Sequence, residues 1–211
     1  MTEALIEPTE KTHTKSTIIE RPKLTFPSEI CNWVEQLYET AETILEYGSG
    51  GSTVMASEKP GKTVFSVESD LAWCQKMQDY FDTAGTASSV TLHYANIGSV
   101  GKWGRPTTNK RWQRYHRYPN SVWDRADFRA PDLVLVDGRF RAACVMTTLL
   151  RTERPVTLLF DDYVGRKQYQ RVEQFIKPVE IRGRMARFEI SPTSLPRHNF
   201  TEVLTLFTKS F

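Results

Sequence analysis

The sequence predicts an α/β fold in which helices cover both faces of a doubly wound, mostly parallel β-sheet. Three observations support this prediction. Short apolar segments alternate along the chain with segments whose apolar residues recur at helical spacing. A glycine-rich turn at 48–51 stands between the first apolar segment and the helical pattern that follows it. The composition, 39% apolar and 25% charged over 211 residues, is typical of a globular domain.

Five strands are expected to lie parallel, because a helical pattern or a long connection separates each from the next. These strands span residues 43–47, 63–67, 90–95, 132–136 and 155–160. The helices expected around them span about 30–38, 52–57, 71–81, 139–150 and 165–176. Ser69 is expected to cap the third of these helices. Two further strands, at 187–190 and 202–207, are expected to form an antiparallel edge.

The chain is expected to hold one domain and a tail. Residues 1–23 contain six Thr and Ser and few large apolar residues, which predicts a mobile N-terminal tail. Residues 24–211 have the length of one ordinary domain. Within it, residues 98–130 form an insertion rich in basic and aromatic residues.

The composition disfavours several classes of protein. No apolar run approaches the roughly 20 residues that a membrane helix needs, and the N-terminus has no apolar core of a secretory signal. The three cysteines, Cys31, Cys74 and Cys144, stand far apart and in no metal-binding spacing. We therefore expect a cytoplasmic protein with no membrane partner and no disulfide framework.

The turn at 48–51 is a candidate ligand site, because open α/β sheets bind ligands at the carboxyl ends of their strands. Glu68 ends the next strand, where a carboxylate can accept hydrogen bonds from ribose hydroxyls. The two features predict an adenosine-containing cofactor. Two residues before the turn stands Glu46, which would repel a pyrophosphate but not a cationic cofactor. The dinucleotide fingerprint is also incomplete, since Thr53 stands at its last glycine position.

These motifs resemble those of the class I S-adenosylmethionine-dependent methyltransferases, and most of all small bacterial methyltransferase-like proteins. The resemblance rests on residues 44–50, 67–68, 96 and 131–138, and it spans about residues 28–208. Two departures are Ser52, where a third glycine is common, and Asn96, where Asp is frequent. The resemblance implies a seven-stranded sheet with an antiparallel C-terminal edge.

The resemblance also implies S-adenosylmethionine as the cofactor. Glu46 and the glycine turn would hold its methionine end, Glu68 its ribose, and Asn96 with Ile97 its adenine. The full set of residues that the resemblance assigns to the cofactor is Glu46, Tyr47, Gly48, Ser49, Gly50, Gly51, Glu68, Ser69, Asn96 and Ile97.

Three carboxylates follow the fourth and fifth strands, whose ends lie about 5 Å apart in a parallel sheet. Asp137 or Asp161 is a candidate catalytic base. Asp137, Asp161 and Asp162 together are candidate ligands of Mg²⁺, an arrangement that resembles the metal-dependent catechol-type O-methyltransferases. Alternatively, Asp161 and Asp162 cap the next helix or pair with arginines, for which the candidates are Arg139, Arg141 and Arg166.

The insertion has a local net charge of +6 over residues 102–129, while the whole chain carries only +3. Three interpretations stay open: a surface insertion whose aromatic residues pack on the domain, a lid over the substrate, or a surface for single-stranded nucleic acid. As a lid it would supply the candidate substrate residues Arg105, Arg111, Arg114 and His116.

The sequence thus predicts methyl transfer from S-adenosylmethionine to an oxygen or nitrogen of a small acceptor, anionic or aromatic. No N/D-P-P-Y/F motif is present, which disfavours methylation of exocyclic amino groups. Two alternatives remain: a non-catalytic module that binds an adenosine cofactor or nucleic acid, and an NAD-dependent oxidoreductase. The oligomeric state stays open, and a homodimer is compatible with the sequence.

Overall fold

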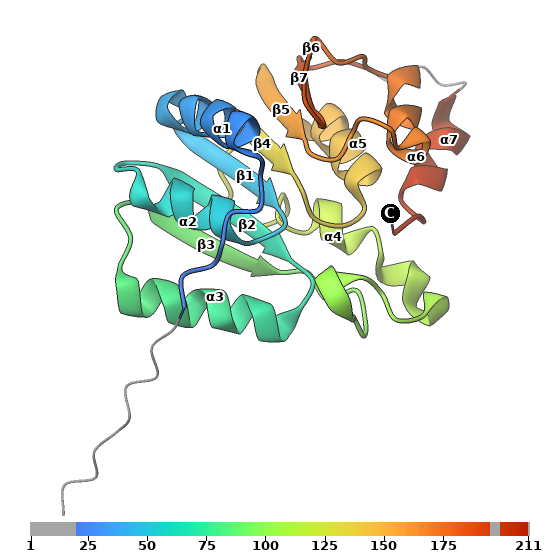
Figure 1. Ribbon diagram of the computed structural model, residues 1–211. Helices are drawn as coiled ribbons and strands as arrows, with labels where there is room; N and C mark the ends of the chain where they lie inside the picture. Colours follow the sequence, from blue (N-terminus) through green and yellow to red (C-terminus); the bar gives the residue numbers. More distant parts are fainter. Residues whose placement is uncertain (1–19, 195–198, 211) are drawn as a thin grey trace, which may run out of the picture.

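The computed structural model describes residues 20–194 and 199–210 (Figure 1). Most of the predicted mobile tail, residues 1–19, lies outside the described residues. Within them, no helix combines the length and apolar character needed to cross a membrane.

A seven-stranded sheet forms the centre of the domain, with strand order β3-β2-β1-β4-β5-β7-β6. The first five strands run parallel, and β7 is antiparallel to both β5 and β6. This confirms the predicted fold class. The strands are β1 (Thr43–Tyr47), β2 (Thr63–Glu68), β3 (Ser89–Tyr94), β4 (Leu133–Val136), β5 (Val156–Phe160), β6 (Glu180–Arg182) and β7 (Met185–Ile190).

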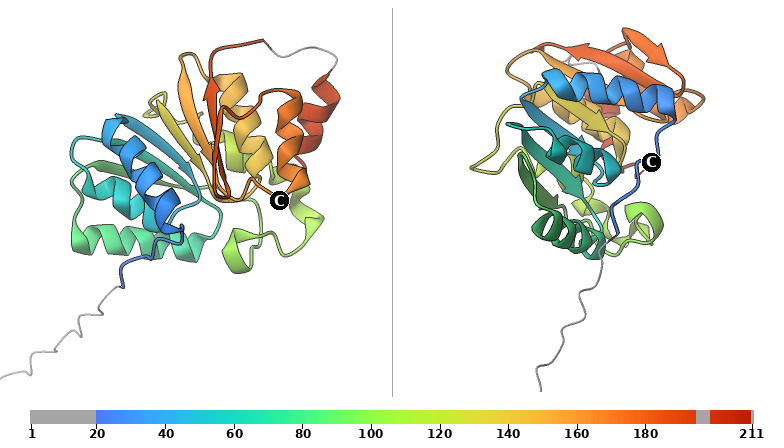
Figure 2. Two further views of the ribbon diagram at one scale, coloured as in Figure 1. Left: turned by 45° about the horizontal axis from the view of Figure 1, so that its top comes forward. Right: turned by 60° about the vertical axis from the view of Figure 1, so that its left-hand side comes forward.

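Helices cover both faces of this sheet, as the two views in Figure 2 show. The helices α1, α2 and α3 pack on one face, and α5 with α4, α6 and α7 on the other. Their bounds are α1 (Ser28–Thr40), α2 (Gly51–Glu58), α3 (Leu71–Ala84), α4 (Arg117–Asn120), α5 (Arg141–Arg151), α6 (Lys167–Gln170) and α7 (Phe200–Leu206). Short 3-10 helices span Lys102–Gly104, Asn109–Arg114 and Arg171–Gln174.

The central strands β1 and β4 are buried throughout because successive side chains alternate between two cores. Ile44 and Leu135 face α1, whereas Leu45 and Val134 face α5. Both faces are therefore closed to water, and a ligand can reach the sheet only at its edges or strand ends.

The second half of the insertion packs against the α5 face of the sheet. Tyr118 and Trp123 are buried in the core that contains α5. Trp123 Nε1 donates to Tyr47 Oη at 2.7 Å, and Tyr47 Oη donates to the Pro119 carbonyl at 2.7 Å. Phe128 stacks on Phe65 with ring centroids 5.0 Å apart. The aromatic residues in this half of the insertion therefore pack on the domain as part of its core.

Three local predictions are corrected by the structure. Residues 202–207 form most of a helix rather than a strand, because Val203 and Leu206 are both buried at helical spacing. The expected helix at 165–176 is reduced to a single turn, α6, and the following 3-10 helix. The cap of α3 is Asp70, whose Oδ1 accepts from Ala72 N and Trp73 N, rather than Ser69.

Candidate active site

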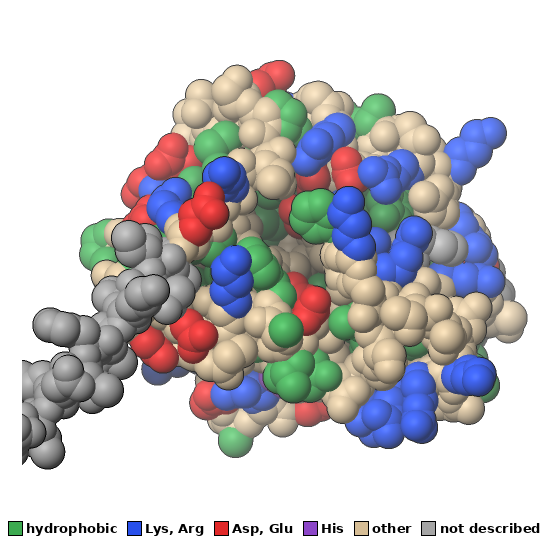
Figure 3. Space-filling view, turned by 60° about the horizontal axis from the view of Figure 1, so that its bottom comes forward, with side chains coloured by type: hydrophobic (Ala, Val, Ile, Leu, Met, Phe, Trp, Pro, Cys, Tyr) green, Lys and Arg blue, Asp and Glu red, His purple; other side chains and the backbone are tan. Residues whose placement is uncertain are grey.

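The carboxyl ends of four parallel strands meet at one edge of the sheet, because Tyr47 pairs with both Val67 and Val136. The residues after these strands line a hollow of about 750 Å³. It contains the glycine turn, Glu68 and the three candidate aspartates. Figure 3 shows this hollow with carboxylates and Lys or Arg side chains around it.

Two glycines bring the ends of β1 and β4 into direct contact. A Cβ on Gly48, whose φ is +108°, would lie 2.8 Å from Gly138 Cα. A Cβ on Gly138 would collide with the hydroxyl of Tyr118. Neither position can carry a side chain, and this leaves the backbone bare at the floor of the hollow.

Glu46 lies beneath the glycine turn and does not line the hollow. Its carboxylate is fully buried and accepts hydrogen bonds from Tyr38 Oη and Thr53 Oγ1. Gly50 N in turn donates to Thr53 Oγ1 at 3.0 Å. Burial raises the pKa of Glu46 to about 7, although these hydrogen bonds act to lower it. Glu46 therefore orients the turn from below rather than reaching a ligand directly.

Glu68 borders the hollow at the end of β2. Its Oε1 accepts from Ser69 N at 2.6 Å and from Asp70 N at 2.9 Å. Burial raises the pKa of Glu68, and these backbone donors oppose that rise. Ser69 faces the insertion instead, with its hydroxyl donating to the Gly104 carbonyl at 3.0 Å. Because the backbone fixes Oε1, Oε2 is the oxygen left to meet a ligand.

Residues 20–26 run across the mouth of the same hollow. A Cβ on Gly51 would collide with the backbone of Lys23 and Leu24, so this segment rests directly on the glycine turn. Arg21 holds it to α2 through a bidentate pair with Glu58, at 2.8 and 2.7 Å. The predicted tail therefore does not extend to residue 23, because residues 20–23 form part of the site.

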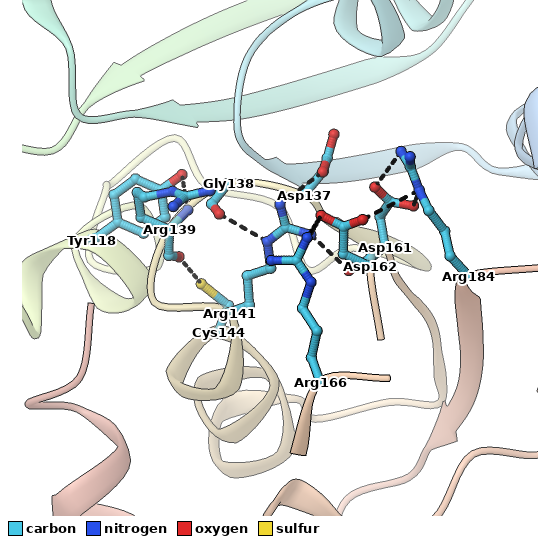
Figure 4. Close-up of polar contacts among 10 residues, drawn as sticks. All are labelled: Tyr118, Asp137, Gly138, Arg139, Arg141, Cys144, Asp161, Asp162, Arg166 and Arg184. Atoms are coloured by element: carbon cyan, nitrogen blue, oxygen red, sulfur yellow. Dashed lines mark hydrogen bonds and ion pairs between the residues drawn. The ribbon is translucent and has the colours of Figure 1, made fainter. Parts of the chain in front are cut away.

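Three arginines neutralise the carboxylates that follow β4 and β5 (Figure 4). Arg184, from the turn between β6 and β7, binds both oxygens of Asp161 at 2.8 Å. Arg166 Nη2 donates to Asp162 Oδ2 at 2.8 Å. The third arginine, Arg141, lies 3.1 Å from Asp137 Oδ1 and donates to the Asp161 carbonyl at 2.6 Å.

This pairing does not fit the predicted magnesium site. A divalent ion needs several oxygens directed at one point, whereas here the carboxylates point at guanidinium groups. Within residues 20–194 and 199–210, no three acidic, His or Cys side chains are arranged to hold a metal ion. The structure gives no support to Mg²⁺, and arginine pairing by Arg141 and Arg166 is confirmed.

The candidate bases differ in their access to the hollow. The side chain of Asp161 is 1% exposed and held on both oxygens by Arg184. The side chain of Asp137 is 28% exposed and has a single ion pair, with Arg141. Burial raises the pKa of Asp137, Arg141 opposes the rise, and the negative charge of Asp161 adds to it. Of the two, Asp137 is therefore the accessible carboxylate.

A second hollow of about 420 Å³ adjoins the first beneath the start of the insertion. Arg139 and Trp103 line both hollows, and Arg105 lines the second. Of the other predicted substrate residues, Arg111 packs over Gly98, while Arg114 and His116 are not among the residues that line either hollow.

The residues predicted to hold adenine also lie outside the hollow. Ile97 is buried in the core, and the exposed Asn96 accepts a hydrogen bond from Gly98 N at 3.1 Å through its side chain. Near Glu68 the wall is formed instead by Trp73, Trp103 and Gly104. Trp73 Nε1 donates to the Ser49 carbonyl at 2.8 Å, which fixes this ring beside the glycine turn.

The sequence reasoning missed several residues at the site, among them Arg184, Trp73 and the segment 20–26. Arg139 and Arg141 were considered only as ion-pair partners. Their position directly after Asp137-Gly138 was a usable signal, since residues following a parallel strand lie at the ligand edge. Arg184 had no such signal, because only the return of β7 brings it to Asp161.

The chain is similar to a methyltransferase-like protein from Silicibacter pomeroyi, with 44% identity over 90% of this chain and 98% of that one, and a TM-score of 0.86. The chain belongs to the class I S-adenosylmethionine-dependent methyltransferases. A scan of protein-family models and a search of curated proteins find no match.

More distant methyltransferases share the fold alone. The O-methyltransferase TomG from Streptomyces achromogenes, solved in complex with S-adenosylmethionine, is 16% identical over 82% of this chain and 83% of its own, with a TM-score of 0.56. A putative O-methyltransferase from Klebsiella pneumoniae is 15% identical over 82% and 84%, with a TM-score of 0.53. In a methyltransferase of this class, the cofactor site is expected at the strand ends where the hollow lies.

Proposed function

We propose that the protein transfers a methyl group from S-adenosylmethionine to an oxygen or nitrogen of a small acceptor. The observation that carries this proposal is that Asp137, the accessible carboxylate, shares one hollow with the bare glycine turn and Glu68. The residues proposed to bind the cofactor and the candidate base thus lie at the same edge of the sheet, at the carboxyl ends of its parallel strands.

The residues at this edge suit the cofactor. The contact between Gly48 and Gly138 leaves backbone without side chains where a ligand must approach closely. The Glu68 carboxylate can accept hydrogen bonds from ribose hydroxyls through Oε2. Glu46 positions the turn through Thr53 instead of touching the methionine end. Asn96 and Ile97 lie outside the hollow, so Trp73 and Trp103 are better placed to flank the adenine.

Asp137 is the proposed general base. When bound, the cofactor supplies an electrophilic methyl group on a sulfonium. Methyl transfer would break the carbon–sulfur bond and leave the neutral thioether, and the Asp137 carboxylate would accept the proton that the acceptor oxygen or nitrogen gives up. Arg141 orients this carboxylate from 3.1 Å, and the burial that raises the pKa of Asp137 makes it a stronger base.

Methyl transfer and the role of Asp137 can be tested together. We expect release of S-adenosylhomocysteine when S-adenosylmethionine is incubated with a panel of phenols, catechols and amines. Asp137→Asn should lower kcat by roughly 100-fold or more, the usual contribution of a positioned base, and leave the affinity for S-adenosylhomocysteine nearly unchanged. Asp82→Asn, on the exposed face of α3, is the control.

The pH profile gives a second readout. The base must be ionised, so kcat should rise as the pH passes through the raised pKa of Asp137 and then level off. An Asp137→Asn variant with the kcat of the parent would exclude Asp137 as the base. Cofactor binding without transfer to any acceptor would favour a non-catalytic binding module.

A further inference from the structure

We propose that the acceptor is a small aromatic oxyanion, and that Arg139 with Arg105 holds its carboxylate or phosphate group in the second hollow. This inference rests on the proposed function, because it places the acceptor beside the methyl donor.

The charge of the second hollow is the first argument. Its lining contains Lys102, Arg105 and Arg139 but no Asp or Glu. The first hollow, in contrast, mixes carboxylates with arginines. A wall of one sign attracts a counter-charged ligand and repels a cationic one. The second hollow is therefore complementary to an anion.

The isolation of Arg139 is the second argument. Arg141, Arg166 and Arg184 each have a carboxylate partner. Arg139 has none within the part of the chain that the structure describes, and its Nε is buried without a hydrogen-bond partner.

A half-buried guanidinium whose Nε has no hydrogen-bond partner is unfavourable. Burial lowers the pKa of Arg139, and the nearby charges of Arg141 and Arg105 lower it further. An oxyanion bound in the hollow would satisfy the guanidinium and relieve this repulsion.

The position of Arg139 supplies the third argument. It follows Asp137 by two residues at the end of β4, and it lines both hollows. Its backbone N–H donates to Tyr118 Oη at 3.3 Å, which ties this turn to the core. An anion held in the second hollow by the Arg139 side chain would thus adjoin the hollow that contains the proposed base.

Trp103 indicates that the acceptor is aromatic. Its side chain is 73% exposed and lines both hollows, although a large apolar ring is usually buried. Its backbone is held at a φ of +62°, next to Gly104, whose carbonyl accepts from Ser69 Oγ. Such a conformation is disfavoured for a bulky residue and is typical of functional sites. A ring stacked on Trp103 could direct its oxyanion toward Arg139.

A small molecule fits these observations better than nucleic acid. Arg111, Arg114 and Arg117 are basic residues of the same insertion, but none lines either hollow. Arg139 and Trp103, in contrast, line the hollow that contains Asp137. Recognition therefore resides at these two residues rather than along the whole basic segment.

The test is a titration of protein saturated with S-adenosylhomocysteine, followed through the indole N–H signals in NMR spectra. Trp103→Phe assigns the signal of Trp103. The probes are benzoate and phenyl phosphate, and uncharged benzamide is the matched control ligand. We expect both anions to shift the Trp103 signal saturably and benzamide to leave it unchanged. The relative affinity of the two anions distinguishes a carboxylate site from a phosphate site.

Variants locate the binding group. Arg139→Ala should weaken binding of the preferred anion by roughly tenfold or more, the effect of losing a charged hydrogen-bonded pair, and Arg105→Ala should weaken it less. Arg117→Ala, an exposed change outside the hollows, should have no effect. Circular dichroism confirms that each variant is folded, and Arg139→Lys provides a second, less disruptive change.

Three results would overturn the inference. The first is that the Trp103 signal does not shift with either anion, at 20-fold molar excess or at any higher concentration up to the solubility limit of the anion. The second is equal binding by the parent and Arg139→Ala. The third is tight binding of an oligouridylate that depends on Arg111 and Arg114 instead. Failure of the parent to bind S-adenosylhomocysteine would be a different outcome, since it contradicts the proposed function itself.

Discussion

The carboxylate of Asp161 accepts two parallel hydrogen bonds of 2.8 Å from the guanidinium of Arg184. This bidentate pair occupies both carboxylate oxygens of Asp161, which the sequence analysis predicts as a candidate base and a candidate metal ligand. It also ties the end of β5 to the turn before β7, two segments that are 23 residues apart. Asp161 thus stabilises the site instead of acting in it.

Loss of Arg184 should destabilise the protein. Arg184→Ala leaves the Asp161 carboxylate buried without its main partner, but Arg184 is 38% exposed, so water compensates in part. We expect the free energy of unfolding to fall by about 1–3 kcal/mol. Arg166→Ala removes a more exposed pair and should cost less than about 1 kcal/mol. Urea denaturation measures both, and equal losses would contradict the assigned role.

Glu46 should make stability depend on pH. Its pKa is about 7 in the folded protein, against an ordinary value of 4.5. Between these values the folded state keeps a proton that the unfolded chain has lost, so stability falls as the pH rises through this window. The loss should reach about 3 kcal/mol above the folded pKa.

The measurement is urea denaturation at pH 5 and pH 8 for the parent and Glu46→Gln. The glutamine keeps the shape of the side chain and cannot ionise, so the contribution of Glu46 to the pH dependence should disappear, while that of Asp137, whose pKa burial also raises, should remain. Glu153→Gln, at an exposed loop position, is the control. A Glu46→Gln variant that keeps the parent's pH dependence would show that other groups cause it.

Gly51 should be required for docking of residues 20–26. Gly51→Ala places a methyl group against the backbone of Lys23 and Leu24, so the segment must shift. We expect a loss of about 1–3 kcal/mol in stability and faster tryptic cleavage after Lys23. Gly50→Ala is the matched control, because a Cβ there meets nothing within 4 Å. Similar cleavage rates for the two variants would contradict the observed contact.

Gly104 should be required for the shape of the first hollow where its wall adjoins Glu68. Its φ is +67°, and a Cβ there would lie 2.5 Å from Ser69 Oγ and 3.1 Å from Glu68 Oε1. Gly104→Ala should cost about 1–2 kcal/mol in stability, the usual penalty for alanine in this conformation. Because it displaces Glu68, it should also weaken binding of S-adenosylhomocysteine.

Gly101→Ala serves as the control for Gly104→Ala. A Cβ at Gly101 would make only an ordinary contact of 3.5 Å with Thr107 Cγ2. Calorimetry should give this variant the affinity of the parent. If Gly104→Ala also binds S-adenosylhomocysteine like the parent, the insertion does not shape the cofactor site.

Much of the fold could be predicted because its signals are local. Strands β1, β4 and β5 are short, largely apolar runs that are mostly buried, and the glycine turn and Glu68 mark the carboxyl ends of β1 and β2. The segment 202–207 was predicted wrongly because it is a short, largely apolar run, while burial of Val203 and Leu206 selects a helix. Short segments of this kind are decided by the surface on which they pack.

The site could be predicted only in part, because its charges are set by long-range contacts. Asp137, Asp161 and Asp162 were correctly placed near one another by the order of strands. Their arginine partners depend on how β7 returns to β5, and no local pattern contains that information. Residues 20–23 have a polar sequence that predicts a tail, and only the absent side chain of Gly51 allows Lys23 and Leu24 to dock.

Calorimetric titration of S-adenosylhomocysteine into the parent, Glu68→Ala and Glu68→Gln tests the central claim most directly. We predict saturable binding to the parent and a loss of about 2 kcal/mol or more, roughly thirtyfold in affinity, for Glu68→Ala, because the ribose loses its charged acceptor. Glu68→Gln keeps an acceptor for the backbone N–H groups and should show a smaller loss. Unchanged affinity in Glu68→Ala, or binding of NAD in preference to S-adenosylhomocysteine, would contradict the account.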